Sequence, residues 1–560
     1  MPPPMEMMIL MGLSDPVNGE FLPIEIRQRL EAIVGIEHVA SDEATRQRYA
    51  RSSSAAPAAP PAVVRPVSTE QVQRLVELAG SCGLALHPIS RGCNWGYGDA
   101  CPPTPGQVVV DLSRMNRIVE LNRRLGYVVV EAGVSQGQLW EYLQAQAPEL
   151  WMDSTGAGPE ASLVGNTLER GFGHTRYGDH SATTCGMQIV LGDGRVLETG
   201  FGHYRQAAAQ RVYRHGIGPS LDGLFAQSNF GIVTQIGLWL MPAPEALCAF
   251  FFSSDEAAAL GEFVERLAPL RMSGQLQSAI HIGNDLRLLS ARTRYPWARA
   301  GDRTPLPTNV RRALCREFGI AAWTGCGTIT GSVGAVRATS RALRRALRPY
   351  RVVLLNDRRL ALVQRVSGSL GKWGVGVGLK ERLATVEPLY RLLKGEPTAE
   401  ALAATLWRVR GPLPEPVTNP LDARAGIMWN SPVLPLTGEN AQAVLALIEP
   451  IHEAHGFEAM VTFTMISERA MIAVTNLYFD TGEADEARRA VACREEVGRA
   501  LMAAGYLPYR VGPGGVAKLR EGSEVFWDVV GQLKAVLDPR GVISPGRYEP
   551  GRSSPSRSGG

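Results

Sequence analysis

The stretch "ERGFGHTRYGDH", at residues 169–180, holds the side chains with the clearest potential for chemistry. It is too polar for a core strand and too rich in glycine for a stable helix, so we predict a loop. A carboxylate such as Asp179, beside His174 and Arg176, can take a proton or stabilise a developing positive charge. The alternative is a solvated turn aspartate. The elements and motifs around the loop decide between the two.

Metal chemistry is not indicated by the sequence. His174 and His180 lack carboxylate or cysteine partners at a recognisable ligand spacing. The eight cysteines are scattered and form no C-x-x-C pair, which argues against a zinc ribbon and a thioredoxin-type redox pair. We therefore predict no metal site.

A second candidate loop is "PISRGCNWGYGDA", at residues 88–100, directly after a predicted strand. Glycine permits positive φ and close backbone approach, so successive N–H groups of such a loop can turn toward a diphosphate. An ordinary glycine-rich turn is the alternative. The chain contains neither G-x-G-x-x-G nor G-x-x-x-x-G-K-[ST], so a Rossmann site and a P-loop are both unsupported.

The elements that must position these loops alternate between strand and helix patterns. After a Pro/Ala-rich stretch that resembles a linker, Val63 begins a strand, helix, strand unit whose helix starts near Ser68. β-Branched runs around Val108–Val110 and Val128–Val130 predict further strands, and a helix is expected from about Ser135. This part of the chain is predicted to be α+β.

Two prolines, Pro242 and Pro244, interrupt the pattern, and we predict a domain boundary there. Beyond them, helical patterns such as "ALGEFVERLAPL" alternate with apolar strand-like runs such as "AMIAVTNLYF". A chain of 560 residues is expected to form two or three domains. Residues 551–560 are rich in Gly, Ser, Pro and Arg, which predicts a disordered tail.

Composition limits the partners. Apolar residues make up 45% of the chain and charged residues 20%, as in a globular enzyme. The net charge is only +4 and no basic block is interleaved with aromatic residues, so we predict no nucleic-acid partner. No apolar run reaches the length of a membrane span and no basic leader is present, so we expect no membrane partner and a cytoplasmic location. A homo-oligomer stays open.

Three longer segments carry a resemblance to a known family. They read "PEASLVGNTLERGFGHTRYGDH", "SLDGLFAQSNFGIVTQIGLWLMP" and, near the carboxyl end, "LDPRGVISPGRY". Together with the first glycine-rich loop, their order and wording closely resemble the vanillyl-alcohol oxidase and 4-cresol dehydrogenase family of flavoproteins. The resemblance extends from about Val63 to Tyr548 and is strongest before Pro242 and after Gly505.

The resemblance implies an α+β fold of two domains, namely a PCMH-type FAD-binding domain and an α/β cap domain. Residues 1–242 would form the FAD-binding domain, with its core at about 60–242. Residues 243–504 would form the cap over the isoalloxazine ring, and residues 505–550 would return to the FAD-binding domain.

FAD is the cofactor that the resemblance implies. In that family the first glycine-rich loop holds the FAD diphosphate, the "GNT-ER" segment passes beside the flavin, and "DGLF-QSN-GIVT" completes the cavity. The matching residues of this chain are Ser90, Arg91, Gly92, Cys93, Asn94, Trp95, Gly96, Gly165, Asn166, Thr167, Asp222, Gly223 and Ile232.

The resemblance also assigns substrate-binding residues. Tyr97, Tyr509 and Arg510 match the two tyrosines and the arginine that hold a phenolate, and Asp179 matches the aspartate beside flavin N5. A phenol has a pKa of about 10, and a buried guanidinium with two hydroxyl donors stabilises its ionised form. A phenolate pushes electron density to its para position, which makes a benzylic C–H a hydride donor and a p-quinone methide the product. The alternative is that Tyr509 and Arg510 merely end a helix or strand.

Two departures from the family bear on how FAD is bound. A His or Tyr of the cap often bonds covalently to the flavin, near the stretch that here spans residues 419–435 and contains neither. More distant relatives carry a flavin-linking His where this chain has Cys93. We therefore expect FAD to be bound non-covalently, with a Cys93 linkage as the alternative.

A third departure is Arg176, which stands where relatives usually have proline. A guanidinium three residues before Asp179, with His174 close by, could bind a substrate carboxylate bidentately. A quinone methide with a carboxylate on the next carbon could then lose carbon dioxide. The alternatives are that Arg176 faces solvent or pairs with Glu169.

We therefore predict an FAD-dependent oxidoreductase that takes a benzylic hydride from a para-substituted phenol, with oxidative decarboxylation of a tyrosine-derived natural product as the specific hypothesis. Three alternatives stay open. They are an oxidase of the 4-alkylphenol or vanillyl-alcohol type that gives a hydroxylated or dehydrogenated product, a 2-hydroxy acid or sugar oxidase of the same fold, and a flavin-binding partner protein without turnover.

Overall fold

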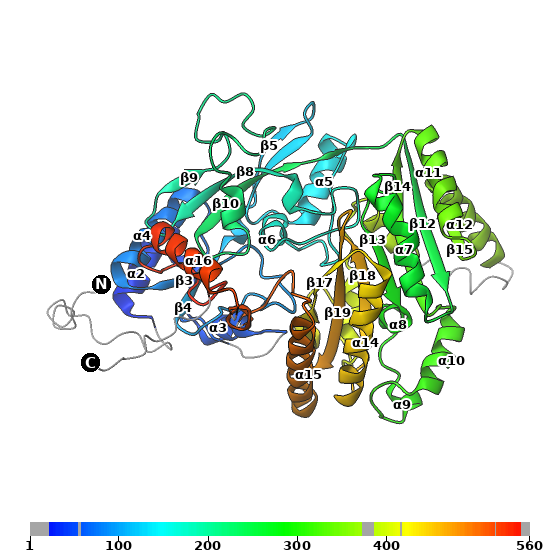
Figure 1. The fold of residues 1–560 in the computed structure, drawn as a ribbon. Helices are drawn as coiled ribbons and strands as arrows, with labels where there is room; N and C mark the ends of the chain where they lie inside the picture. Colours follow the sequence, from blue (N-terminus) through cyan, green and yellow to red (C-terminus); the bar gives the residue numbers. More distant parts are fainter. Residues whose placement is uncertain are drawn as a thin grey trace.

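The computed structural model describes residues 22–53, 58–371, 386–414, 417–513, 515–520 and 522–549. The predicted disordered tail, at residues 551–560, lies outside this part of the chain. Within the described residues, helices and strands are arranged around three main sheets (Figure 1). No helix among them is long and apolar enough to cross a membrane.

A small sheet near the amino terminus carries the first glycine-rich loop. Its strands β2 and β3 run parallel to β4, and β1 pairs antiparallel with β2. The predicted strand, helix, strand unit is confirmed, because α4 lies between β2 and β3 and begins where the Ser68 side chain accepts a hydrogen bond from the Gln71 amide. The elements of this region are α2 (Ile24–Val34), β1 (Val39–Ala40), α3 (Glu43–Ala50), β2 (Val63–Val64), α4 (Thr69–Cys82), β3 (Ala85–Ile89) and β4 (Gln107–Asp111).

A five-stranded antiparallel sheet follows, in the order β5-β6-β10-β8-β9. The helix predicted from Ser135 is present as α5, with the Ser135 side chain as its cap. Both small sheets and their helices share one hydrophobic core. The elements are β5 (Ile118–Asn122), β6 (Tyr127–Glu131), α5 (Gln136–Gln146), α6 (Leu163–Leu168), β8 (Thr184–Leu191), β9 (Val196–Glu198) and β10 (Gly231–Trp239), with a separate pair formed by β7 (Leu150–Trp151) and β11 (Met241–Pro242).

The carboxyl-terminal residues pack against these first two sheets. Val542 and Ile543 are buried in the same core, and the Ser544 amide donates to the Leu86 carbonyl at 2.7 Å. The ammonium of Lys534, on α16 (Glu524–Leu537), is buried and donates to the Asn229 and Ile543 carbonyls. In Figure 1 this red helix lies among the blue amino-terminal elements.

A large antiparallel sheet lies on the other side of the molecule, in the order β15-β12-β14-β13-β18-β19-β16, with β17 paired to β19 (Figure 1). Helices α7, α11, α14 and α15 pack on one face and form a second hydrophobic core with it. The strands are β12 (Ala246–Ser254), β13 (Ile280–Asn284), β14 (Trp323–Gly331), β15 (Arg351–Leu355), β16 (Ala425–Asn430), β17 (Val433–Pro435), β18 (Met460–Met465) and β19 (Ala470–Asp480). The helices are α7 (Ala259–Met272), α8 (Asp285–Ser290), α9 (Trp297–Ala300), α10 (Thr308–Phe318), α11 (Val333–Ala346), α12 (Asp357–Gly371), α14 (Gly438–Ala454) and α15 (Ala484–Ala503).

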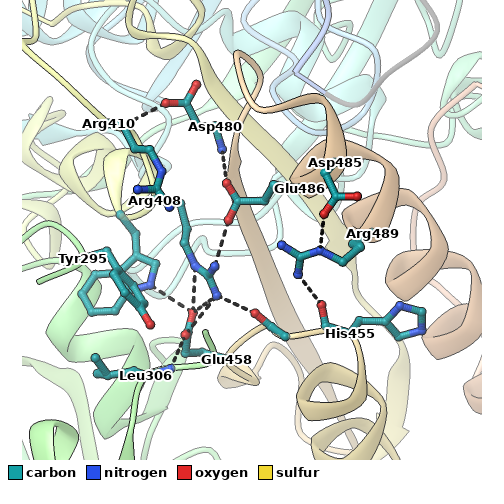
Figure 2. Close-up of polar contacts among 12 residues, drawn as sticks. Tyr295, Leu306, Arg408, Arg410, His455, Glu458, Asp480, Asp485, Glu486 and Arg489 are labelled. Carbon is teal, nitrogen blue, oxygen red and sulfur yellow. Dashed lines mark hydrogen bonds and ion pairs between the residues drawn. The ribbon is translucent and has the colours of Figure 1, made fainter. Parts of the chain in front are cut away.

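A buried ionic cluster joins two loops and helix α15 at one end of this large sheet (Figure 2). The Arg408 side chain has no exposed surface and lies between the carboxylates of Glu458 and Glu486, at 2.9 and 2.8 Å. Burial by itself lowers the pKa of Arg408, but the two carboxylates outweigh burial and raise it. Arg408 is therefore charged and fully paired.

One expectation about the backbone needs correction. The Pro/Ala-rich stretch before Val63 is packed where the structure describes it, because Ser53, Ala58 and Ala62 are all buried. The Ser53 hydroxyl donates to the Asp99 carboxylate at 2.8 Å and accepts from the Gly96 amide at 2.7 Å. Small side chains allow this close packing, so here the composition reflects tight contact rather than a free linker.

Candidate active site

The first glycine-rich loop leaves the carboxyl end of β3. Gly92, Gly96 and Gly98 all adopt positive φ, at 70°, 78° and 113°, as a loop of this kind requires. Among the described residues, no group accepts a hydrogen bond from the amides of Gly92, Cys93, Asn94 or Trp95. Four successive amides without a protein acceptor form a donor set that suits a diphosphate.

Gly96 has a second role that the sequence did not indicate. A Cβ at this position would lie 2.0 Å from the indole of Trp429, on β16. The same indole donates to the Trp95 carbonyl at 2.8 Å. The absence of a side chain at Gly96 therefore lets the large sheet pack directly on the glycine-rich loop.

The predicted flavin segment, Gly165 to Thr167, forms half of the short helix α6. Ser162 caps this helix and accepts from the Gly165 amide at 3.0 Å. A Cβ on Gly165 would lie 3.3 Å from the Ser90 hydroxyl, so α6 and the first loop are neighbours. The structure thus brings these two predicted groups together.

The remaining predicted cofactor residues lie in a third segment. Ile232 is buried within β10, and Asp222 and Gly223 begin the short 3-10 helix η4 (Asp222–Phe225). The Asp222 carboxylate is buried, and its Oδ1 atom has no hydrogen-bond partner among the described residues. This segment is far from the first glycine-rich loop, with Ser90 and Arg91, in the sequence. The contact of Asp222, Gly223 and Ile232 with FAD stays a prediction.

Arg510 lies in a largely buried group of polar and charged residues, which we call the Glu169 cluster: Glu169, Arg510, Arg547 and Tyr548. The carboxylate of Glu169 contacts the guanidinium of Arg547 and accepts from the Tyr548 hydroxyl at 2.6 Å. The Nε atom of Arg510 lies 3.1 Å from the same carboxylate, close enough for an ion pair but not aligned as a hydrogen bond. Burial would raise the pKa of Glu169, but Arg547 and Arg510 outweigh burial and lower it to about 2. The cluster therefore holds two guanidinium charges against one carboxylate charge.

Both predicted tyrosines adjoin this cluster. The guanidinium of Arg510 lies 4.3 Å from the ring centroid of Tyr97 and also contacts the Asn94 side chain. Burial, and then the neighbouring Tyr509, raises the pKa of Tyr97 well above 10, so its hydroxyl stays protonated. That hydroxyl is 3.1 Å from Ser431. The amide of Tyr509 donates to the Ser431 carbonyl at 3.0 Å, so Tyr509 and Arg510 lie in an irregular segment rather than at the end of a helix.

The opening stretch forms a tight hairpin beside this cluster. The Gly173 amide donates to the Gly178 carbonyl at 2.9 Å, and Phe172 and Asp179 face each other across the hairpin. The Phe172 ring lies 5.7 Å from the Tyr509 ring. Asp179 is exposed, and its carboxylate accepts only from the Ala182 amide among the described residues. Asp179 is therefore available to contact a ligand at the edge of the Tyr509 site.

Arg176 and His174, the tentative carboxylate-binding pair, lie in different environments. The Arg176 side chain is exposed and lies over the Tyr177 ring, at 5.3 Å. It forms no hydrogen bond or ion pair with Asp179 or Glu169 within the described part of the chain. Its contact with substrate stays a prediction, and no contact joins Arg176 to Tyr97, Tyr509 or Arg510 among the described residues.

His174 instead belongs to a group of buried and half-buried histidines that spans the hairpin and the large sheet. The backbone amide of His174 donates to Asp153, whose other carboxylate oxygen lies 2.8 Å from His180. The imidazole of His174 packs on that of His281, with ring centroids 4.7 Å apart. No group of three or more His, Cys, Asp or Glu residues suited to a metal ion occurs within the described ranges. Sequence reasoning did not single out His281, because an isolated histidine in a strand carries no signal by itself.

Other residues of the site were also missed. The sequence places Glu169 only in the segment beside the flavin and as a possible partner of Arg176, and it places Arg547 and Tyr548 only in the closing motif. Glu169 and Arg547 carry opposite charges and could therefore be predicted to form an ion pair. Nothing in the sequence, however, indicates that their two segments meet.

Comparisons with known proteins agree with this geometry. Residues 60–200 match the FAD binding domain family. The 1'-carboxy-chondrochloren decarboxylase of Chondromyces crocatus is 35% identical over 519 residues, which covers 92% of this chain and 95% of that protein. The 4-cresol dehydrogenase [hydroxylating] flavoprotein subunit of Pseudomonas putida is 29% identical, over 87% of this chain and 88% of that one. The structure of 4-ethylphenol oxidase from Gulosibacter chungangensis superimposes with a TM-score of 0.83 at 29% identity, over 94% of this chain and 96% of that one.

The fold and the site define an FAD-dependent enzyme with a PCMH-type FAD-binding fold. The chain belongs to the vanillyl-alcohol oxidase and 4-cresol dehydrogenase family of flavoproteins. The donor set of residues 92–95 fits the diphosphate of FAD, the cofactor of this family.

The way FAD is bound yields a prediction. Burial raises the pKa of the Cys93 thiol to about 12, so this sulfur stays protonated and is a poor nucleophile toward a flavin. We expect acid precipitation of the holoenzyme to release all flavin into the supernatant, leaving a colourless pellet. Flavin fluorescence that migrates with the polypeptide in a denaturing gel would contradict this, and its loss in a Cys93→Ser variant would identify the linkage.

Proposed function

We propose that this enzyme oxidises a para-substituted phenol by removing a hydride from its benzylic carbon. The observation that carries the proposal is the Glu169 cluster, in which two guanidinium groups face one ionised carboxylate beside two tyrosines. Its net positive charge is buried, so it favours the ionised form of a phenol over the neutral form. The names of the relatives, a 4-cresol dehydrogenase and a 4-ethylphenol oxidase, support the same substrate class.

The residues of the site have different roles, which follow from their positions. Arg510, the protonated hydroxyl of Tyr97 and the hydroxyl of Tyr509 hold the phenolate oxygen, while Glu169 fixes the orientation of Arg510. Phenolate formation sends electron density to the para position, which makes the benzylic C–H a better hydride donor. FAD, when bound, supplies the hydride acceptor. Asp179 lies at the far edge of the Tyr509 site, where a carboxylate stabilises positive charge or takes a proton.

We further propose oxidative decarboxylation for substrates that carry a carboxylate on the carbon next to the benzylic carbon. Hydride loss gives a p-quinone methide, and cleavage of the bond to the carboxylate then returns its electron pair to the ring. The products are carbon dioxide and a vinyl phenol, and FAD takes up the two electrons. The relative named as a decarboxylase supports this proposal.

The test is anaerobic mixing of the FAD holoenzyme with a matched pair of phenols, 4-propylphenol and 3-(4-hydroxyphenyl)propanoate. We expect both to bleach the flavin, and the second to release one carbon dioxide per flavin reduced. A hydroxylated product that keeps its carboxylate would contradict the decarboxylation but not the phenol oxidation. If lactate or a sugar reduces the flavin and neither phenol does, the enzyme is a 2-hydroxy acid or sugar oxidase. If no compound reduces the flavin, the protein binds flavin without turnover.

A further inference from the structure

His281 has an unexplained polar atom at the boundary between the hairpin and the large sheet. Its Nδ1 atom lies 3.0 Å from the Thr464 hydroxyl, so that side of the ring has a partner. Its Nε2 atom is buried and has no hydrogen-bond partner among the described residues. Buried polar atoms in proteins are nearly always paired, so an unpaired one calls for a ligand or another explanation.

The position of His281 relates it to the proposed substrate. The ring packs on His174, and the Ala279 amide at the start of β13 donates to the Thr175 carbonyl of the hairpin. Phe172, two residues before His174, packs on Tyr509. Two residues of extended chain span about 7 Å. One strand of the hairpin therefore contacts Tyr509 through Phe172 and His281 through His174. These two contacts mark the two ends of the proposed substrate site.

Among the residues that the structure describes, the surroundings of His281 offer no charged group that pairs with its Nε2 atom. Its partners in register on the neighbouring strands are Cys326 and Thr464. Burial raises the pKa of Cys326 to about 12, so this thiol is neutral. Burial also lowers the pKa of His174 and lowers that of His281 well below 6.5, so both rings are neutral. The carboxylate of Asp153 is already engaged by His180 and by the amides of His174 and Thr175.

We propose that His281 is a specificity-determining residue whose Nε2 atom hydrogen-bonds to an oxygen on the para side chain of the phenol, the carboxylate in the proposed decarboxylation. Arg510 and the tyrosines then bind one end of the substrate and His281 the other, across the carbon that loses hydride. His174, stacked on the ring, positions it. This inference rests on the proposed phenol oxidation. It assigns to the buried Nε2 atom of His281 the contact that the sequence suggested for Arg176.

Amide variants separate the two nitrogens of the ring. Asparagine reproduces the Nδ1 position and so retains the bond to Thr464, whereas glutamine reproduces the Nε2 position. For His281→Asn we expect the KM for 3-(4-hydroxyphenyl)propanoate to rise on the order of 10- to 100-fold, as for loss of a hydrogen bond to a charged group. The KM for 4-propylphenol should stay within about 3-fold of wild type, and His281→Gln should restore much of the lost affinity.

The control is His452→Gln, which changes a buried histidine on α14, whose Nδ1 atom lies 2.8 Å from the Ile448 carbonyl. It should leave both substrates unaffected. Equal losses for both phenols in His281→Asn, or no loss for either, would overturn the inference while the wild-type enzyme still oxidises phenols. A wild-type flavin that neither phenol reduces would overturn the proposed function and this inference with it.

Discussion

Replacement of Arg510 by leucine should lower the rate of flavin reduction by 4-propylphenol at pH 7 by about 1,000-fold. Without this guanidinium the bound phenol returns toward its ordinary pKa of about 10, so only about one molecule in 1,000 is ionised at pH 7. Glu169 keeps Arg547 and Tyr548 as partners, so the variant should still fold and bind FAD. Stopped-flow absorbance of the flavin under anaerobic conditions measures the rate.

The pH profile distinguishes loss of ionisation from general damage. In Arg510→Leu the rate should rise about tenfold per pH unit toward pH 10, because the phenol ionises as pH rises through its pKa. The wild-type rate should change much less over the same range. Arg510→Lys keeps the positive charge and should lie between the two. A pH-independent loss in Arg510→Leu, or full activity, would refute the role of Arg510 in phenolate binding.

The second large effect concerns stability. Arg408→Met should destabilise the protein by about 3–5 kcal/mol, because it leaves two buried carboxylates, those of Glu458 and Glu486, without their counter-ion (Figure 2). The side chain also lies over the rings of Tyr295 and Phe457, at 4.8 and 5.0 Å, and methionine keeps part of that packing. The measurement is the shift in the urea unfolding midpoint of the holoenzyme.

Two comparisons test the cause. Arg488→Met removes an exposed ion pair with Asp485 and should cost less than about 1 kcal/mol. Combining Arg408→Met with Glu458→Gln and Glu486→Gln removes the unpaired charges and should recover much of the loss. If the triple variant is as unstable as Arg408→Met alone, packing rather than charge explains the effect.

Much of the local structure could be predicted from the sequence because its signals are local. The Ser68 and Ser135 caps set the starts of α4 and α5, and the valine runs became β4 and β6. The glycines of the first loop adopt the positive φ expected of them. The family motifs extended this to FAD, to the class of enzyme and to the residues Tyr97, Tyr509 and Arg510, which the structure places together.

Other features could not be predicted from neighbouring residues in the sequence. Gly96 is required by the indole of Trp429, more than 300 residues away in sequence, and the Pro/Ala-rich stretch packs through Ser53 against Asp99. Gly173 of the opening stretch has a similar reason, since a Cβ there would collide with Asp153 of an earlier segment. Contacts of this kind depend on which distant segments meet.

By itself, the sequence determined the cofactor motifs and most of the local elements, and it led to the prediction of which residues bind a phenolate, since each depends on neighbours along the chain or on a motif. The tertiary structure decided their electrostatics. It joined Glu169 to Arg547 and Tyr548 from the far end of the chain, exposed Arg176, and set His281 against His174. A charge changes the chemistry of a site only through groups within a few ångströms of it, and those distances are created by folding.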